Sequence, residues 1–262
     1  MLAPLSAAIV NRAQQSQVKV IAYGRLIPDA PIDYYVSIDP FKVGQQQAEV
    51  QMDAIEESGA DSPKVVMING APTDSNAKPY KDGASQVLKE RGAQIVKSYD
   101  TPDWSPDKAQ QEMEASITGL GKDGFDAVYV ANDGMAGGAI AALKGANIDP
   151  KTRFVTGQDA ELAGVQRILS GEQLMTVYQP IIDIAETAAE LAVPLAQGKQ
   201  PPADLATDKV DNGAKQVPSV LLDTIAIEKD NIDSTVVKDG FLDVGEICTG
   251  SYKEACKEAG LQ

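Results

Sequence analysis

The chain has 262 residues, with 23 Lys and Arg against 38 Asp and Glu, which gives a net charge of −15, and it contains no histidine. This length suits one large domain or two modest ones, and the missing histidine excludes Ser-His-Asp and Cys-His nucleophile systems and histidine-based zinc sites. The acidic balance disfavours binding to nucleic-acid phosphates or to anionic membranes, because both need Lys and Arg.

Short apolar runs, each followed by a segment with helical spacing of apolar residues, recur along the chain. The pattern predicts strands at residues 18–23, 64–69, 93–97, 126–131, 153–156, 174–178 and 219–227. It predicts helices at residues 41–57, 78–91, 106–120, 134–145, 161–170 and 181–197. Such alternation is typical of right-handed βαβ units. We therefore predict an α/β fold with doubly wound parallel sheets.

The predicted elements are unequally distributed. Residues 64–178 supply five strands with four intervening helices, which is enough for one complete doubly wound sheet. The strands and helices that remain cannot cover both faces of a second parallel sheet. The sequence therefore predicts one whole α/β lobe and a fraction of a second.

The N-terminus and the apolar runs bear on export and membranes. Residues 1–17 lack the basic and long apolar regions of a signal peptide, so we expect any export signal to lie outside this chain. No apolar run reaches the ~20 residues of a membrane span. The longest, residues 181–195, is interrupted by Asp183, Glu186 and Glu190.

The only two cysteines, Cys248 and Cys256, lie close together near the C-terminus. Gly250 and Ser251 between them permit a turn. Two interpretations stay open, namely a local disulfide formed in an oxidising compartment, or two free thiols of which one is buried in a small helix.

Ligands of doubly wound sheets bind beyond the carboxyl ends of the strands. The residues that follow the predicted strands are mostly carboxylates and amides, with one guanidinium and the only indole of the chain. Planar Asp, Asn and Arg side chains can hydrogen-bond two adjacent sugar hydroxyls, and an aromatic face covers the C–H side of the ring. We therefore predict carbohydrate binding, with these candidate residues: Arg25, Asp74, Asn76, Trp104, Asn132, Asp159 and Gln179.

Each candidate also has a purely structural interpretation. Asn132 or its neighbour Asp133 could cap the helix that follows, and Asp159 could cap the helix after that. Asp74 and Asn76 could be turn and cap residues. Trp104 could pack against a helix, and Arg25 could form a surface ion pair. Their common position at strand ends is what favours a binding role.

Taken in order, the strand-end segments resemble the xylose-binding members of the periplasmic sugar-binding proteins that serve ABC transporters. The segments are VKVIAYGRLI, APTDSNAK, DTPDWSPDKAQ, VANDGMAGGAIAAL, TGQDAELAGVQRI, LMTVYQPI and VVKDGF. The resemblance extends to about Phe241, so the cysteine-bearing tail lies outside it. It implies the two-lobe periplasmic-binding-protein type 1 fold, in which a sugar is enclosed by hinge closure without chemistry.

Carried over to this chain, the resemblance implies sugar contacts by Arg25, Asp74, Asn76, Trp104, Asn132 and Asp159. Two departures affect the expected site. Gln179 replaces a lysine of the family's hinge motif, and Gly24 replaces an aspartate beside the arginine. We expect these differences to alter the sugar preference or the affinity.

A third departure concerns the first lobe. Full members begin with two further βα units and a strand before the segment that matches residues 2–17. We therefore expect an incomplete N-terminal lobe (residues 1–38 plus 181–218) and a C-terminal lobe (residues 39–180 plus 219–262), with crossings near Ile38, Gln179 and Pro218. Such a lobe would leave sheet edges and apolar surface open, so we expect self-association or exchange of elements, or a need for the missing segment.

The resemblance implies an extracytoplasmic protein, periplasmic or extracellular and either free or lipid-anchored. It would capture a monosaccharide, D-xylose or a related aldose, and deliver it to an ABC transporter permease. No cofactor, metal or nucleic acid is implied. A sugar-responsive effector domain of a transcriptional regulator, or a chemoreceptor partner, is the alternative, although the charge is unfavourable for DNA. An enzyme with paired carboxylates is a third class, and we expect no enzymatic activity.

Overall fold

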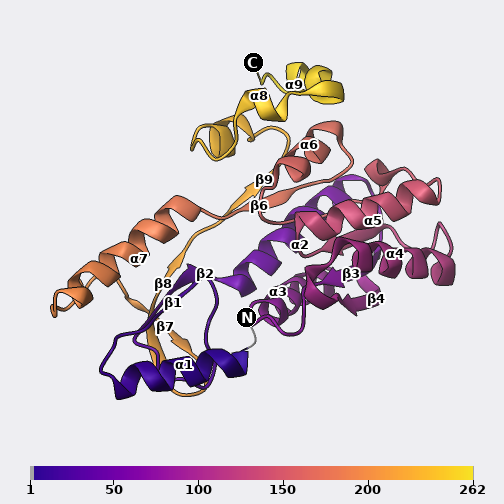
Figure 1. The fold of residues 1–262 in the computed structure, drawn as a ribbon. Helices are drawn as coiled ribbons and strands as arrows, with labels where there is room; N and C mark the ends of the chain where they lie inside the picture. Colours follow the sequence, from indigo (N-terminus) through magenta and orange to yellow (C-terminus); the bar gives the residue numbers. More distant parts are fainter. Residues whose placement is uncertain (1–2, 262) are drawn as a thin grey trace. The chain divides into compact units, whose positions relative to one another are not determined.

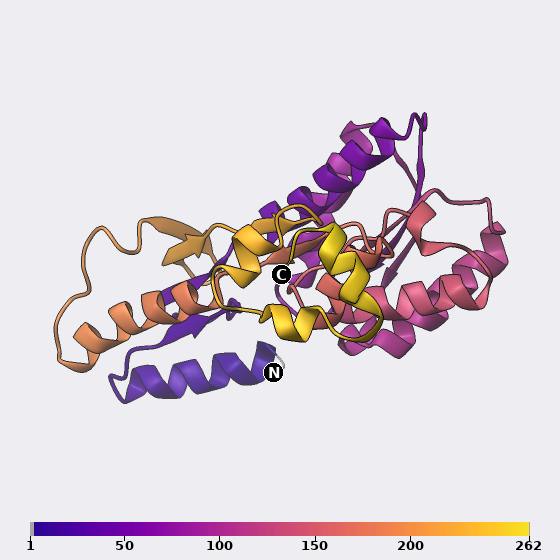
Figure 2. The ribbon, with the colours of Figure 1, turned by 90° about the horizontal axis from the view of Figure 1, so that it is seen from above.

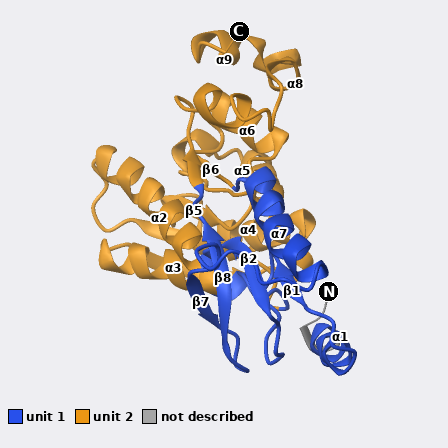
Figure 3. Ribbon diagram, turned by 90° about the vertical axis from the view of Figure 1, so that its left-hand side faces the viewer, with its two compact units in different colours: residues 1–40, 73–78, 179–224 blue, residues 41–72, 79–178, 225–262 orange. Residues whose placement is uncertain are grey.

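The computed structural model describes residues 3–261. The chain forms two compact units, drawn in blue and orange in Figure 3. Unit 1 comprises Met1–Pro40, Thr73–Lys78 and Gln179–Thr224, and unit 2 comprises Phe41–Pro72, Pro79–Tyr178 and Ile225–Gln262. Residues 1, 2 and 262 belong to the lobes predicted from the sequence and lie outside the described residues.

Unit 1 is built on a four-stranded sheet in the order β1-β2-β8-β7. Its strands are β1 (Ile21–Tyr23), β2 (Tyr34–Ile38), β7 (Asp208–Asp211) and β8 (Gln216–Leu222). The first three strands of that order are parallel, and β7 runs antiparallel to β8. Figures 1 and 2 show two helices beside these strands, α1 (Ala3–Gln15) and α7 (Ile181–Ala196).

The core of unit 1 is small. Val10 of α1 is buried together with Ile32, Tyr35 and Val217 in one cluster. In α7, some apolar side chains such as that of Leu191 are buried, whereas others stay exposed. The exposed ones are Ile181, Ile182 and Val193, at 49%, 55% and 54%.

Unit 2 contains a parallel three-stranded sheet in the order β4-β3-β5. The strands are β3 (Lys64–Asn69), β4 (Gln94–Asp100) and β5 (Ala127–Val130), and the helices of this region are α2 (Pro40–Glu57), α3 (Ala77–Glu90), α4 (Pro106–Leu120) and α5 (Asp133–Gly145). All four residues of β5 are buried. A single large cluster including Met67, Phe125 and Met135 fills the space between the sheet and the helices.

The rest of unit 2 surrounds a second, two-stranded sheet. There β6 (Thr176–Tyr178) pairs antiparallel with β9 (Ile225–Ile227), next to α6 (Leu162–Ser170). The C-terminal tail adds η3 (Asp233–Val237), α8 (Val244–Ile247), η4 (Gly250–Tyr252) and α9 (Lys253–Glu258), and two further short turns are η1 (Pro102–Trp104) and η2 (Pro150–Thr152). Ile247 of the tail is buried with Val165 of α6 and with Tyr178.

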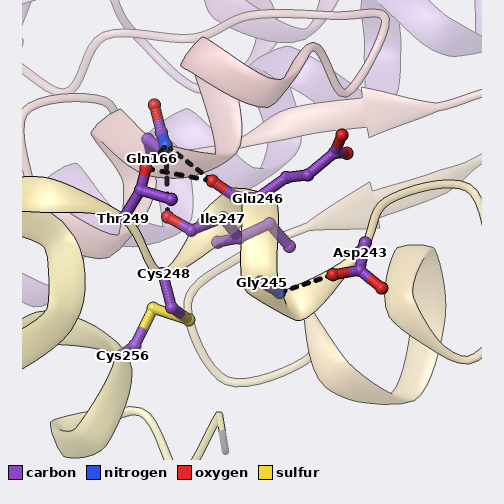
Figure 4. The surroundings of a disulfide bond; sticks show 8 residues. All are labelled: Gln166, Asp243, Gly245, Glu246, Ile247, Cys248, Thr249 and Cys256. Carbon is purple, nitrogen blue, oxygen red and sulfur yellow. Dashed lines mark hydrogen bonds between the residues drawn. A yellow bond between two sulfur atoms is a disulfide. The ribbon is translucent and has the colours of Figure 1, made fainter.

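A disulfide between Cys248 and Cys256 holds the tail together, with the two Cα atoms 5.8 Å apart. Figure 4 shows how the tail is also attached to α6. Gln166 Nε2 donates to the carbonyl oxygens of Glu246 and Ile247 at 3.2 and 3.1 Å. The cysteine pair is therefore part of a structure that covers one side of α6.

The predicted α/β fold with parallel sheets is confirmed, but two predicted strands are wrong. Residues 153–156 are not a regular strand, because Phe154 has a left-handed backbone with φ of 42°. The segment still bonds β5 through its backbone, since Val128 N donates to Arg153 O at 3.0 Å and Thr156 N donates to Val128 O at 3.2 Å. Thr156 also bonds β5 through its side chain. Its Oγ1 accepts from Val130 N at 2.8 Å and donates to Val130 O at 3.0 Å. The five-stranded sheet expected in residues 64–178 is therefore interrupted, and β6 pairs with β9 instead.

The second correction concerns residues 219–227, which were predicted as one strand. The structure has two, β8 and β9, separated by Asp223 and Thr224. The two strands pair with different sheets in different units, so the chain passes from unit 1 to unit 2 between them. Elements that were not predicted include α1, β2 and β7, together with the short helical segments between residues 233 and 258.

Candidate functional site

Three candidate residues of unit 1 come together where β1 ends. Arg25 Nε lies 2.7 Å from Asp74 Oδ2. The other carboxylate oxygen of Asp74 accepts from Asn76 N at 2.9 Å, and Asn76 Nδ2 donates to the carbonyl oxygen of Gly24 at 3.1 Å. Residues that are about 50 positions apart in the sequence thus form one polar cluster.

The members of this cluster differ sharply in exposure. The side chain of Arg25 is 64% exposed, whereas that of Asp74 is 9% exposed. An ion pair with so exposed a member contributes little to stability, at most about 1 kcal/mol. Burial raises the pKa of the nearby Tyr35 hydroxyl, and a hydrogen bond with Ser37 opposes that shift. The arrangement presents a guanidinium to solvent and holds it in place by a nearly buried carboxylate.

Trp104 lies in unit 2, on a backbone turn that only a few residue types adopt readily. Asp103 and Trp104 both have left-handed backbone angles, with φ of 57° and 55°. The indole packs over Gly70, directly after β3, and any Cβ at that position would overlap the ring. Tyr80 meets the indole edge-on, with ring centroids 6.3 Å apart. The indole is half-buried, so part of it stays accessible.

Asp159 stands in a loop of unit 2, residues 157–161, with φ of 93°. Its carboxylate accepts from Gln158 Nε2 at 3.3 Å, and the same amide nitrogen lies 3.1 Å from Tyr80 Oη. Tyr80 therefore links the Trp104 indole to the side chain that holds Asp159. Gln158 Oε1 is buried and has no hydrogen-bond partner among the described residues. Gln158 is not among the candidate residues, although its position after a predicted strand and just before Asp159 is a usable signal.

Asn132 caps helix α5, as its structural interpretation expected. Its Oδ1 accepts from Met135 N at 3.0 Å. That bond occupies the oxygen and leaves the Nδ2 amide to donate to a ligand. The cap does not exclude a binding role, and it fixes the direction in which the amide can point.

Gln179 is the first residue of unit 1 after β6 and lies two residues before the start of α7. Its carbonyl oxygen accepts from Ile181 N at 2.8 Å. The candidate set is thus divided, with Arg25, Asp74, Asn76 and Gln179 in unit 1 and Trp104, Asn132 and Asp159 in unit 2.

The described residues, 3–261, also bear on metal binding and on membrane insertion. Within that range, no group of three Cys, Asp or Glu side chains is placed to bind a metal ion. No helix in the same range combines the length and hydropathy that a membrane span requires.

Comparisons with known proteins identify the family. Residues 3–200 match the family described as the periplasmic binding protein domain. The D-xylose-binding periplasmic protein of Escherichia coli is 42% identical over 237 residues, which are 89% of this chain and 69% of that protein. The multiple sugar-binding periplasmic receptor ChvE of Rhizobium radiobacter is 34% identical over 249 residues, 89% of this chain and 70% of that protein.

Solved structures agree with this match. A solute-binding protein of an ABC transporter from Clostridium phytofermentans, with bound β-D-glucose, superposes with a TM-score of 0.80 at 27% identity, over 92% of this chain and 78% of that one. A carbohydrate-transporter solute-binding protein from Chloroflexus aurantiacus, in complex with D-glucose, superposes with a TM-score of 0.80 at 29% identity, over 92% of this chain and 77% of that one. These relatives are transport proteins and not enzymes, as expected for this chain. The chain belongs to the periplasmic binding protein family, together with the D-xylose-binding and multiple sugar-binding proteins.

Proposed function

We propose that this protein binds a monosaccharide, D-xylose or a related aldose, and delivers it to an ABC transporter permease without a chemical step. The observation that carries the proposal is the 42% identity to a D-xylose-binding periplasmic protein over 89% of the chain. The candidate residues fit this role, because they offer planar hydrogen-bonding groups and one aromatic face.

The division of the candidates between two units suggests how binding would work. In unit 1, Arg25 and Asp74 would each hydrogen-bond sugar hydroxyls, together with Asn76. In unit 2, the Trp104 indole would cover an apolar face of the ring. A sugar that contacts both sets at once would favour the arrangement of the units in which both sets reach it. Hinge closure would then signal occupancy to the permease.

Calorimetry with D-xylose, D-ribose, L-arabinose, D-glucose and D-galactose tests this proposal. We expect saturable heat with D-xylose. The dissociation constants of the other sugars give the order of preference. Arg25→Ala should weaken binding by about tenfold or more, because a charge-assisted hydrogen bond is lost. Arg91→Ala is the matched control, since Arg91 also forms exposed ion pairs, with Asp53 and Glu56. Absence of heat with all five sugars would refute direct binding.

We also propose a periplasmic or extracellular location, free or lipid-anchored. The disulfide between Cys248 and Cys256 supports an oxidising compartment, because such bonds rarely persist in the cytosol. Fractionation of the native host with an antibody against the chain tests this, and partition into detergent separates a lipid-anchored form from a free one. Recovery in the cytosolic fraction would contradict the proposal.

We further propose that unit 1 corresponds to an incomplete N-terminal lobe and that the chain self-associates through it. Strand β1 lies at one edge of its sheet, and α7 exposes Ile181, Ile182 and Val193. Open strand edges and apolar patches both favour association. Sedimentation velocity should show concentration-dependent species above the monomer, and Ile182→Lys should reduce them. A protein that stays monomeric at every concentration would refute self-association.

A further inference from the structure

The carboxyl group of Asp133 is the feature of unit 2 that the proposed binding does not yet use. Asp133 is the first residue of α5 and is fully buried. Its Oδ1 accepts from Gln173 Nε2 at 2.6 Å. Its Oδ2 accepts from Glu161 N and from Thr176 Oγ1, each at 2.9 Å. A buried carboxylate with this many partners joins α5 to two other segments.

All three partners must be donors. Arg167 Nε donates to Gln173 Oε1 at 3.0 Å, and since a guanidinium can only donate, the amide NH₂ of Gln173 faces Asp133. Thr176 Oγ1 accepts from Ala160 N at 3.1 Å, so its single hydrogen is directed to Asp133. Such a shell suits an ionised carboxylate. A protonated carboxyl would bring an O–H into a shell of three donors, so that one of the present hydrogen bonds would be lost.

Two glycines shape the space around this carboxylate. A Cβ at Gly157 or at Gly164 would overlap the carboxylate of Asp133. Gly157 belongs to the loop that carries Asp159, and Gly164 lies in the first turn of α6. The backbone therefore approaches the carboxylate closely from two sides, and the space admits a side chain of this size and no larger.

The loop that carries Asp159 depends on these bonds. Asp159 and Ala160 have φ of 93° and 48°, a conformation that is unfavourable for residues other than glycine. Asp159 N donates to Val177 O at 2.9 Å, and Ala160 N donates to Thr176 Oγ1. The next backbone N–H along the chain is the one that Asp133 accepts. The strained segment is thus held at three successive backbone donors.

The start of α5 is tied to the same loop. Asp133 N donates to Gln158 O at 2.9 Å, and Arg167 Nη2 donates to the carbonyl oxygen of Asp133. Asn132, the preceding residue, therefore cannot move independently of the loop.

We infer that Asp133 is a positioning residue for sugar binding, whose ionised carboxylate fixes Asp159 and Asn132 in the orientation that a sugar requires. This inference rests on the proposed function. Asp133 is fully buried and acts through its two neighbours, without contacting the sugar. Loss of the carboxylate would free the loop to relax from its left-handed conformation and would turn the Asp159 side chain away.

The pH dependence of binding follows from the same geometry. Burial raises the pKa of Asp133 to about 7, against the opposing effect of its hydrogen bonds and of Arg167. Because only the ionised form fits the donor shell, sugar affinity should fall below pH 7, whereas this group's contribution to folding stability should rise there. Other charged or titratable groups face Asp133 or its partner Arg167: Glu161 before α6, Glu172 after α6, and Tyr252 of η4.

Three variants test the inference, by calorimetry with D-xylose and by hydrogen exchange of the sugar-free protein. Asp133→Asn and Thr176→Val should each weaken binding by about tenfold or more, and both should speed exchange at the amides of Ala160 and Glu161. Thr176→Ser keeps the hydroxyl and should restore both properties. In the wild type the affinity should fall by about tenfold from pH 7 to 5.5, and it should stay flat in Asp133→Asn.

The outcomes separate this inference from the proposed function. Equal binding by Thr176→Val and Thr176→Ser would overturn the positioning role, and so would an Asp133→Asn protein that folds and keeps the wild-type affinity. If the wild type binds no tested sugar, the proposed function fails, and the inference about Asp133 is then tested by hydrogen exchange alone. Unchanged exchange at Ala160 in Thr176→Val would overturn the inference, whereas faster exchange there would support it.

Discussion

Substitution of Gly164 by alanine probes how tightly the Asp133 carboxylate is enclosed. In an exposed part of a helix, Gly→Ala stabilises by about 0.5–1 kcal/mol. At Gly164 the new Cβ would overlap the carboxylate of Asp133 and displace it from its donors. A buried charge that loses its partners costs about 3–5 kcal/mol. After the gain in helix propensity is subtracted, we expect a net destabilisation of about 2–4 kcal/mol.

Gly119→Ala is the matched control, because Gly119 lies near the end of α4 with no atom within 4 Å of a new Cβ. Urea unfolding of both variants at pH 8 measures the difference, and the m-value checks that the cooperative unit is unchanged. The control should be as stable as the wild type or slightly more stable. A Gly164→Ala protein that matches the control would show that the carboxylate can move at little cost, and it would refute the reasoning above.

Three further predictions concern pH, the disulfide and the indole. The pKa of Asp133 is raised to about 7 in the folded state. Its contribution to stability is therefore full below pH ~4 and lost as the pH rises through ~7, by about 4 kcal/mol. Urea titrations of wild type and Asp133→Asn should show this divergence, and parallel pH profiles would contradict it. Cys248→Ser with Cys256→Ser opens a loop with a sequence separation of 8 and should cost about 2.5 kcal/mol, measured by thermal unfolding without reductant. No loss of stability would contradict that value. Trp104 is the only tryptophan, so its fluorescence should change on sugar binding, and Gly70→Ala should abolish the change by displacing the ring. A Gly70→Ala protein with the wild-type response would refute that packing.

The helices were predictable because their signal is local. In α2 and α4 the apolar residues repeat with helical spacing, and Pro106 begins α4 at the predicted residue. Strands depend on partners far away in the sequence, and these are not visible in a single segment. The apolar run at residues 153–156 predicts a strand, but the left-handed backbone of Phe154, with φ of 42°, breaks its regular pairing with β5.

The candidate site likewise contains residues that the sequence could reveal and residues that it could not. Arg25, Asp74 and Asn76 could be singled out, because each follows a predicted strand. Their contact with one another could not be predicted, because β1 and β3 belong to different sheets. The sequence places Asp133 after a predicted strand and next to Asn132, where it could also cap a helix, but gives no sign of a positioning role. Its burial and its bond to Thr176 follow from the packing of α6 and β6 on α5, which no local pattern reveals.

Exposure separates the residues expected to touch a ligand from those that hold them. The Arg25 side chain in its ion pair with Asp74 is 64% exposed, so breaking that pair costs at most about 1 kcal/mol. A ligand hydroxyl can therefore replace it and leave again, as a carrier requires. The bonds of Asp133 are fully buried, where loss of a partner costs several times more. If, as we infer, the buried carboxylate fixes the direction of neighbouring groups, the groups that a wrong sugar leaves unpaired would disfavour its binding.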